Sequence, residues 1–266
     1  MAIHERTDID STATISDDCE IGPGVVIGPD TVIESGVSIG PNVVIGPRTT
    51  IRKGAVIYPG AILGLEPQDF KYDGAPTTCE IGERTIIREY CTVNRGTKAS
   101  GATIVGSDCM LMTYAHVGHD CRVGNKVVLA GGVLIGGHCT VEDLAILGGN
   151  VAMHQFTRIG KLAMVGGLAG LRQDAPPFMI TAGYPPAVVY GVNSIGLRRN
   201  GITVEARQLL KDAFRILYRS GLNRSDALAK IIEEIDQIPE IKYLVEFYGS
   251  SKRGVARGSL TQTDIQ

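Results

Sequence analysis

Aliphatic residues recur along the chain at every sixth position. Ile fills nine consecutive positions of this series, from Ile9 to Ile57, and the count continues to Leu171, with Ile, Leu, Val or Met at 25 of 28 positions. Six residues of an α-helix turn through about 600°, which is not a whole number of turns, so a helix cannot produce the pattern. A second slot, four residues after each aliphatic one, holds mostly Ala, Cys, Val or Thr. If both slots face inward, six residues form one flat strand with a corner, and three such faces close a triangular coil. The sequence therefore predicts a parallel β-helix with coils of about 18 residues.

Glycine and proline mark the corners of the predicted coils. Gly usually follows the aliphatic residue, as in IGPG, IGPD, IGPN and IGPR, where a tight corner needs a permissive backbone. Two stretches, 65–78 and 94–103, keep the count of six but lose much of the apolar filling. We expect them to be protruding loops, where functional residues tend to gather.

The pattern becomes helical from about residue 195. The segment 203–222 predicts a helix capped by Thr203 and ended by Gly221, and 223–239 predicts a second helix that begins at a Ser or Asn cap and stops at Pro239. We therefore divide the chain into a β-helix domain, residues 1–190, and a C-terminal helical domain, residues 191–266. Four cationic residues of the first helix recur every fourth position and share a face: Arg207, Lys211, Arg215 and Arg219. This face is either solvated or a docking surface for an acidic partner.

Composition and charge narrow the class of protein. Among 266 residues there are 34 Gly and no Trp, and aromatics make up 5%, which favours a β-rich core of small branched side chains. The net charge of −2 gives no reason to expect nucleic acid or an anionic membrane as partner. No apolar run is long enough to span a bilayer and the N-terminus lacks a signal peptide, so we expect a cytoplasmic protein. All six cysteines fall in the second inward slot, which indicates small buried side chains in a reducing compartment.

Histidines gather in one part of the predicted β-helix. The chain has five, and His116, His119, His138 and His154 lie within two or three successive coils. Because position 117 faces inward, His116 and His119 belong on the outside. Gly137 and Gln155 follow His119 at intervals of one coil, so they should lie directly above it, about 5 to 10 Å along the stack.

This cluster suits acyl transfer. A histidine can deprotonate an alcohol near neutral pH, an orienting carboxylate can hold its ring, and an exposed backbone N–H can stabilise the oxyanion. We expect His119 to be the base and Gly137 the oxyanion donor, and Asp69 in the first loop is the candidate orienter. A metal site is the rival interpretation of clustered histidines. We expect no metal, because HVGH has only two residues between its histidines and the Gly-rich context offers no third ligand at a matching distance.

Several motifs then resemble one enzyme family. They are EPQDFKY at 66–72, NRGT at 94–97, AHVGHDC at 115–121, GGH at 136–138, GGN and MHQF within 148–156, QDAPPF at 173–178 and GVNSIGLRRNG at 191–201. Together they closely resemble the acyl-carrier-protein-dependent UDP-N-acetylglucosamine O-acyltransferases of the lipid A pathway, and the match spans nearly the whole chain. The resemblance implies a left-handed β-helix, although the general rule for parallel crossovers favours the right-handed form. It also implies a homotrimer with active sites between subunits, and transfer of a 3-hydroxyacyl group from acyl carrier protein to the glucosamine 3-hydroxyl.

The resemblance also implies roles for individual residues. His119, Asp69 and Gly137 would be catalytic, and no bound cofactor is expected because phosphopantetheine arrives on acyl carrier protein. The residues that resemble substrate contacts are Gln68, Lys71, His116, His138, His154, Gln155, Asn193 and Arg199. Gly167 resembles a position that limits acyl length, and the basic face formed by Arg207, Lys211, Arg215 and Arg219 would dock the acidic carrier protein.

Three departures from the family pattern leave alternatives open. Many relatives have His, Glu and Arg where this chain has Asn94, Ile195 and Asn200. The nucleotide contacts made there, and the choice between a 3-hydroxyl and a 3-amino acceptor, are therefore undecided, as is the acyl length. The loop motifs argue against another hexapeptide-repeat acyltransferase. The early start of the repeat argues against the sister N-acyltransferase. A non-catalytic β-helical scaffold would leave the histidine cluster unexplained.

Overall fold

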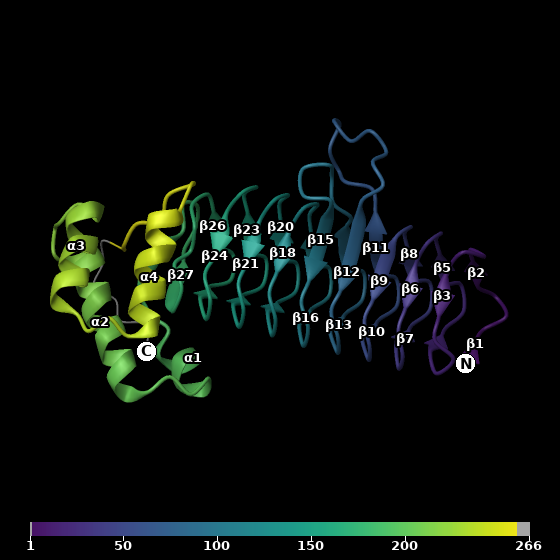
Figure 1. The fold of residues 1–266 in the computed structure, drawn as a ribbon, viewed down its shortest axis with the longest axis horizontal. Helices are drawn as coiled ribbons and strands as arrows, with labels where there is room; N and C mark the ends of the chain where they lie inside the picture. The colour runs from purple at the N-terminus through teal and green to yellow at the C-terminus, as the bar shows by residue number, and fades with distance from the viewer. Residues whose placement is uncertain (1, 260–266) are drawn as a thin grey trace.

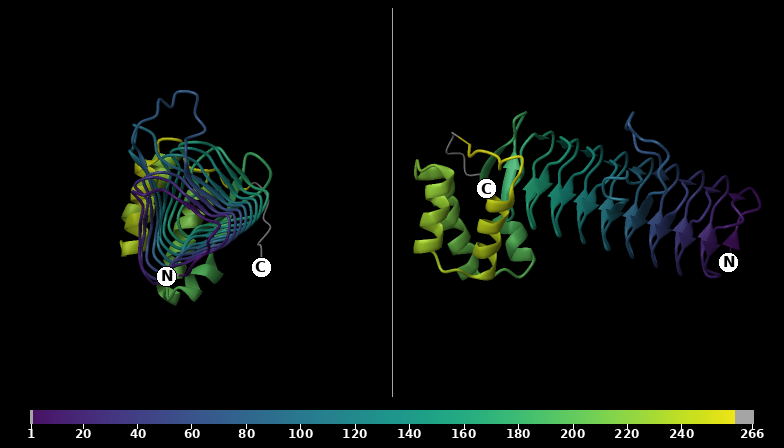
Figure 2. Two further views of the ribbon diagram at one scale, coloured as in Figure 1. Left: turned by 90° about the vertical axis from the view of Figure 1, so that its right-hand side faces the viewer. Right: turned by 45° about the horizontal axis from the view of Figure 1, so that its top comes forward.

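In the part of the chain that the structure describes, a left-handed parallel β-helix is closed at one end by four α-helices (Figure 1). The structure is a computed structural model that describes residues 2–259. Seen down its axis, the β-helix has a rounded triangular outline with a loop projecting from one corner (Figure 2). The predicted fold class is thus confirmed.

Within residues 2–259 the strands form three sheets, one for each face of the prism. The first sheet comprises β1 (Ala2–Ile3), β4 (Glu20–Ile21), β7 (Ser38–Ile39), β10 (Val56–Ile57), β13 (Ile86–Ile87), β16 (Met110–Leu111), β19 (Val128–Leu129), β22 (Ile146–Leu147), β25 (Met164–Val165), β27 (Met179–Ala182) and β28 (Val188–Val192). The second comprises β2 (Asp8–Ile9), β5 (Val26–Ile27), β8 (Val44–Ile45), β11 (Ile62–Leu65), β14 (Thr92–Asn94), β17 (His116–Val117), β20 (Leu134–Ile135), β23 (Ala152–Met153) and β26 (Gly170–Leu171). The third comprises β3 (Thr14–Ile15), β6 (Val32–Ile33), β9 (Thr49–Ile51), β12 (Thr78–Ile81), β15 (Ala102–Val105), β18 (Arg122–Val123), β21 (Thr140–Val141) and β24 (Arg158–Ile159).

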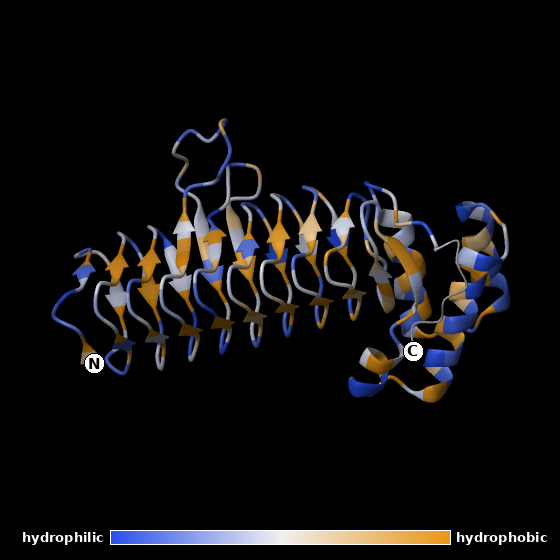
Figure 3. Cartoon of the chain, turned by 180° about the vertical axis from the view of Figure 1, so that it is seen from behind, coloured by the Kyte–Doolittle hydropathy of each residue, from blue (hydrophilic) through white to orange (hydrophobic). Residues whose placement is uncertain are grey.

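The repeat of six places one aliphatic column on each inner wall. Ile21 pairs with Ile39, and Ile39 with Ile57, so these residues stand directly above one another and are all buried. Short apolar strands separated by paler or blue corners are visible along the prism in Figure 3. Stacking coils buries a continuous apolar core that no single coil could bury alone.

Two coils are longer than the rest. Ile21 and Ile39 are separated by a regular coil of 18 residues, whereas Leu63 pairs with Val93 and Val93 with Val117, so these coils take 30 and 24 residues. The additional residues form the two predicted loops, which project beside β11 and β15 (Figure 1). The register of six survives because each insertion is a multiple of six residues.

The six cysteines are buried and free, as expected, but they are more than small apolar side chains. Cys109 donates to the Gly124 carbonyl at 3.0 Å and Cys121 to the Gly136 carbonyl at 3.1 Å. Thr31 in an equivalent slot donates to the Gly46 carbonyl at 3.1 Å. The second slot therefore favours Cys or Thr where a corner carbonyl needs a donor inside an otherwise apolar core.

Up to residue 259, four helices follow the β-helix: α1 (Ser194–Arg199), α2 (Val204–Arg219), α3 (Arg224–Glu234) and α4 (Pro239–Ser250). Thr203 caps α2 as predicted, and Asn223 caps α3. The prediction that the second helix runs to Pro239 is wrong: α3 ends at Glu234, and Pro239 opens α4, because proline suits the first turn of a helix. The predicted domain boundary at residue 190 falls within β28, and the division into two domains stays a prediction. Residues 260–266 of the predicted helical domain lie outside the described residues.

A second apolar core joins the helices to the end of the β-helix. It includes Leu162 and Phe178 from the last coils together with Leu210, Ile241 and Phe247 from the helices. No helix within residues 2–259 is both long and apolar enough to cross a bilayer.

Candidate active site

The candidate site lies on an outer corner of the β-helix between β17 and β18. His119 and Asp120 form this corner, and Asp120 has a left-handed backbone conformation with φ of 60°. His138 occupies the equivalent place one coil further along, also with φ of 60°. The tight corner brings consecutive side chains close together on the outside of the prism, as predicted for the histidines.

His119 and Asp120 are joined by a hydrogen bond. His119 Nδ1 lies 2.7 Å from Asp120 Oδ2, and the two side chains are 12% and 0% exposed. An ionised carboxylate can only accept hydrogen bonds, so the ring must carry its hydrogen on Nδ1 and leave Nε2 free to accept a proton. This is the arrangement required of a histidine that acts as a general base.

The carboxylate of Asp120 is itself held by the second loop. Its Oδ1 accepts the backbone N–H groups of Thr97 at 3.0 Å and Ser100 at 3.1 Å, and the Ser100 hydroxyl at 2.5 Å. Its Oδ2 accepts the Thr97 hydroxyl at 2.8 Å. Burial by itself raises the pKa of Asp120, but the hydrogen bonds from Ser100, His119 and Thr97 outweigh it and hold the pKa well below its usual value. The Asp120 carboxylate is therefore held in its ionised form beside His119.

The carboxylate that contacts the His119 ring is that of Asp120, not that of Asp69, for which we expected the orienting role. Asp69 lies on the first loop, where its Oδ1 accepts the backbone N–H of Lys71 at 3.0 Å. Among the hydrogen bonds of residues 2–259, none joins Asp69 to His119. Sequence reasoning missed Asp120, although it follows His119 directly, because the period of six does not give the left-handed corner that turns its carboxylate back to the ring.

Gly137 lies beside His119, as the coil spacing predicted. A Cβ atom added to Gly137 would lie 2.5 Å from His119 Nε2, closer than real Cβ contacts allow. The Gly137 carbonyl accepts the N–H of Phe156 at 3.1 Å, while the Gly137 N–H has no acceptor among residues 2–259. Gly137 packs against His119 Nε2, so its free N–H is a candidate to bind a developing oxyanion.

The other histidines surround this pair. The ring of His138 meets that of His119 edge-on, with centroids 4.9 Å apart, and stacks on Phe156 at 4.6 Å. His116 Nδ1 lies 2.7 Å from Thr92 Oγ1. Burial, and secondarily the neighbouring His119, lowers the pKa of His116, which keeps this ring neutral at neutral pH.

A metal ion is the alternative use of these groups. The donor atoms of His119, Asp120 and His138 lie within 4.8 Å of one another, so the structure supplies the third donor that we did not expect. However, both oxygens of Asp120 are engaged by the second loop and His119, and Asp120 Oδ2 is 3.8 Å from His138 Nε2. A metal would have to break those hydrogen bonds, so the geometry favours a proton-transfer site; the absence of a metal stays a prediction.

The remaining candidate residues are more scattered within the chain. Gln68 and Lys71 are exposed on the first loop, His154 and Gln155 are exposed one coil beyond His138, and Gly167 lies at an exposed corner. His154 Nδ1 is 3.2 Å from Arg253 of the C-terminal segment, a contact that sequence reasoning missed. Arg199 is exposed at the end of α1.

Asn193 makes two structural hydrogen bonds within the chain. Its Oδ1 accepts the N–H of Gly196 and caps α1, and its Nδ2 donates to the Leu162 carbonyl at 3.0 Å. Its role as a substrate contact stays a prediction, as do those of the residues above.

Arg95 and Asn94 anchor the first loop. Arg95, 4% exposed, donates to the Gly64 carbonyl at 3.2 Å and pairs with Glu66 at 3.2 Å. Asn94 Nδ2 donates to the Glu66 carbonyl at 2.6 Å, whereas its buried Oδ1 has no hydrogen-bond partner within residues 2–259. An unpartnered buried acceptor is costly, so it is a candidate contact for a donor on the substrate.

The cationic face of α2 is only partly free. Lys211, Arg215 and Arg219 are exposed and Arg207 is half-buried. Arg215 pairs with Asp212 at 2.7 Å, and Arg219 Nη1 donates to the Ser259 carbonyl at 2.6 Å. Lys211 is therefore the residue of this face with no hydrogen bond or ion pair from its side chain among residues 2–259.

Comparison by sequence and comparison by structure find the same kind of protein to be similar to this chain. The family model described as UDP-N-acetylglucosamine O-acyltransferase, domain 2, matches residues 174–256, and the bacterial transferase hexapeptide model matches residues 12–47, 30–64 and 102–137. The acyl-(acyl-carrier-protein)–UDP-N-acetylglucosamine O-acyltransferase of Thermodesulfovibrio yellowstonii is 44% identical over 256 residues, covering 96% of this chain and 99% of the relative. The enzyme of the same name from Syntrophobacter fumaroxidans is 43% identical over 258 residues, covering 97% and 100%. The crystal structure of LpxA, a UDP-N-acetylglucosamine acyltransferase from Bacteroides fragilis, matches with a TM-score of 0.93 and 40% identity, covering 96% of this chain and 100% of that one.

Proposed function

Because the chain belongs to the family of UDP-N-acetylglucosamine O-acyltransferases, we propose that it transfers a 3-hydroxyacyl chain from acyl carrier protein to the 3-hydroxyl of UDP-N-acetylglucosamine. This reaction is the first step of lipid A biosynthesis. The observation that carries the proposal is the hydrogen bond between His119 Nδ1 and Asp120 Oδ2, since it leaves His119 Nε2 as a proton acceptor beside a free backbone N–H.

The reaction proceeds by transfer of one proton through His119. His119 Nε2 takes the proton of the 3-hydroxyl while the hydroxyl oxygen attacks the thioester carbonyl and forms the new C–O bond. The oxyanion that develops is stabilised by the Gly137 N–H, and Asp120 stabilises the imidazolium. When the intermediate collapses, the C–S bond breaks and His119 returns the proton to the thiolate of the carrier. The products are the 3-O-acyl nucleotide sugar and free carrier thiol.

The substrates are held by groups around this centre. Lys71 and Arg199 suit phosphate groups, and Asn94 Oδ1 offers an acceptor. Gln68, His116, His138, His154, Gln155 and Asn193 complete the proposed contacts, and Gly167 limits the acyl length. Asp69 and its loop complete the site across a subunit boundary in a homotrimer.

Acyl carrier protein docks on the cationic face of α2, because its acidic surface complements Lys211 and Arg215. Phosphopantetheine arrives on this carrier, so the reaction needs no resident cofactor. In this proposal the reaction takes place in the cytoplasm, and nucleic acid takes no part in it.

The proposal is tested by product analysis. The protein is incubated with UDP-N-acetylglucosamine and carrier proteins bearing 3-hydroxyacyl chains of increasing length, and the nucleotide sugar is examined by mass spectrometry. We expect one chain length to be transferred preferentially and an ester bond at the 3-position. A parallel reaction with a 3-amino analogue of the sugar decides the acceptor, because faster amide formation would replace the 3-hydroxyl in the proposal. No acylated sugar with any carrier would contradict it.

A further inference from the structure

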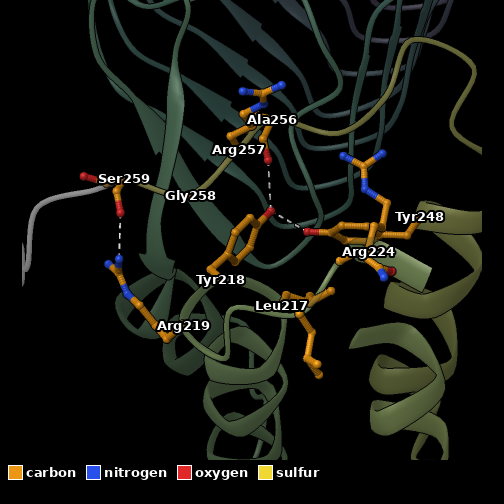
Figure 4. Close-up of a pocket in the computed structure, with 11 residues that line it drawn as sticks. Leu217, Tyr218, Arg219, Arg224, Tyr248, Ala256, Arg257, Gly258 and Ser259 are labelled. Atoms are coloured by element: carbon orange, nitrogen blue, oxygen red, sulfur yellow. Dashed lines mark hydrogen bonds between the residues drawn. The ribbon is translucent and has the colours of Figure 1, made fainter. Parts of the chain in front are cut away.

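A pocket lined by arginines lies among the helices at the end of the β-helix (Figure 4). It has a volume of about 590 Å³. Five segments form it: the end of α2, the α2–α3 connection, the start of α3, α4 and the C-terminal segment 256–259. The lining residues are Leu217, Tyr218, Arg219, Leu222, Asn223, Arg224, Tyr248, Ala256, Arg257, Gly258 and Ser259.

The charge of the pocket is one-sided. Arg219, Arg224 and Arg257 contribute three guanidinium groups, and none of the eleven lining residues is acidic. Guanidinium groups remain charged at any physiological pH, so the pocket carries a positive charge that its own lining does not neutralise. Such a cavity attracts anions.

Two of the three guanidinium groups are fixed in place. Arg219 Nη1 donates to the Ser259 carbonyl at 2.6 Å, and Arg224 Nη2 donates to the Val255 carbonyl at 2.9 Å. Each still has further N–H groups to offer, because a guanidinium has five. Arg257 is exposed, and its side chain has no hydrogen bond within residues 2–259. The pocket thus combines two preorganised donors with one that is free to close on a ligand.

Two of the lining residues are neutral tyrosines. The hydroxyls of Tyr218 and Tyr248 are hydrogen-bonded to each other, and Tyr218 also donates to the Ala256 carbonyl at 3.2 Å (Figure 4). Burial raises the pKa of both tyrosines, so they add no negative charge. Gly258 lets the chain pass close to Tyr218: an added Cβ would lie 2.8 Å from its Cδ1. Together with Leu217 and Leu222, these rings give the pocket an apolar side.

We propose that this pocket binds a soluble organic phosphate, a phosphate monoester or diphosphate with an apolar body. Three arginines without a carboxylate favour a ligand with more than one negative charge, and the planar guanidinium fork matches phosphate oxygens in pairs. The volume is that of a small-molecule site rather than of a bare ion, and the rings of Tyr218 and Tyr248 suit an apolar body. The elements that form the pocket are distinct from those of the His119 corner. The pocket is therefore a second site, and its ligand would contact the helices rather than the β-helix.

The test measures binding directly. Inorganic pyrophosphate is titrated into the full-length protein by isothermal titration calorimetry at low ionic strength, and the arginine variants show whether the binding takes place in this pocket. Arg257→Gln and Arg224→Gln are compared with Arg6→Gln, a matched loss of one exposed arginine at the opposite end of the β-helix. Because the Arg257 side chain makes no hydrogen bond within residues 2–259, its replacement leaves a usable protein even if Arg224→Gln, which loses the bond to Val255, does not fold.

We expect the wild type and Arg6→Gln to bind pyrophosphate with equal affinity and Arg257→Gln to bind about tenfold or more weakly. Absence of binding at millimolar pyrophosphate, or equal weakening by Arg6→Gln, would overturn the proposal. So would binding to phosphatidylglycerol vesicles in a sedimentation assay without binding to pyrophosphate, since the ligand would then be a lipid surface. The measurement does not depend on acyl transfer, so the two proposals can fail separately.

Discussion

His119 Nδ1 lies 2.7 Å from Asp120 Oδ2, and this contact joins two consecutive residues at a corner of the β-helix. It fixes which ring nitrogen carries the hydrogen and which can accept a proton. Asp120 is in turn anchored by Thr97 and Ser100 of the second loop. The loop, the corner and the base therefore form one connected unit.

Asp120→Asn should lower kcat about 100-fold with little change in KM. The amide keeps the shape of the carboxylate but cannot hold the His119 tautomer or stabilise the imidazolium. Steady-state kinetics measures the effect. Asp18→Asn is the matched control, because Asp18 also accepts a serine hydroxyl, that of Ser35, in the first coils of the β-helix. Equal activity of both variants would refute the role of Asp120.

Ser100→Ala should lower kcat about threefold to tenfold, because Asp120 loses a hydrogen bond to Oδ1 that holds its carboxylate in position against the His119 ring. With one donor fewer, the carboxylate interacts more strongly with the protonated His119 ring. The imidazolium therefore persists to higher pH, and the acid limb of the pH–rate profile should move to higher pH. Ser35→Ala, which removes a similar hydroxyl from Asp18, should leave the profile unchanged. A purely structural role for Ser100 predicts a lower rate at every pH with no displacement of this limb.

Gly137→Ala should reduce activity about 100-fold in a folded protein. The new methyl group would lie 2.5 Å from His119 Nε2 and 2.6 Å from its Cε1, so the ring must leave its position. Gly131→Ala is the control, since a Cβ there meets its nearest neighbour, the Thr113 carbonyl oxygen, at 3.5 Å. Wild-type turnover by Gly137→Ala would show that neither the ring position nor the space around it matters.

His116 predicts a pH dependence of stability. Its pKa in the folded protein is lowered by burial and by His119, so below about pH 6.5 the unfolded chain binds a proton that the folded chain does not. The free energy of unfolding of the wild type should therefore fall more steeply than that of His116→Gln between pH 7.5 and pH 5.5. The difference is at most about 1.4 kcal/mol per pH unit. Urea unfolding at fixed protein concentration measures it, and parallel curves for the two proteins would contradict the burial of a neutral His116.

The sequence is sufficient to predict the β-helix and its register. A period of six survives both loops, so the pairing of Ile21, Ile39 and Ile57 follows from counting alone. Handedness does not follow, because the same inward pattern fits a coil of either hand; here it came from the family resemblance. The start of α4 was missed for a local reason, since Pro239 can end one helix or open the next.

The site could be predicted only in part. The spacing of one coil brings Gly137 to His119, and the structure confirms this neighbour. Asp120 could not be recognised, because its contact with His119 depends on a left-handed corner rather than on the period. Arg95 was likewise missed. It is buried and anchors the first loop through contacts with Gly64 and Glu66, and these lie about 30 residues away in the chain.

The most direct test of the account is the turnover of His119→Asn. Transfer from 3-hydroxyacyl carrier protein to UDP-N-acetylglucosamine is followed by mass spectrometry and compared with wild type and with His4→Asn, which changes a histidine in the first coil whose Nδ1 accepts the N–H of Arg6. We predict that His4→Asn matches wild type and that His119→Asn, with an unchanged oligomeric state, loses activity by about 100-fold or more. Wild-type turnover by His119→Asn would contradict the mechanism.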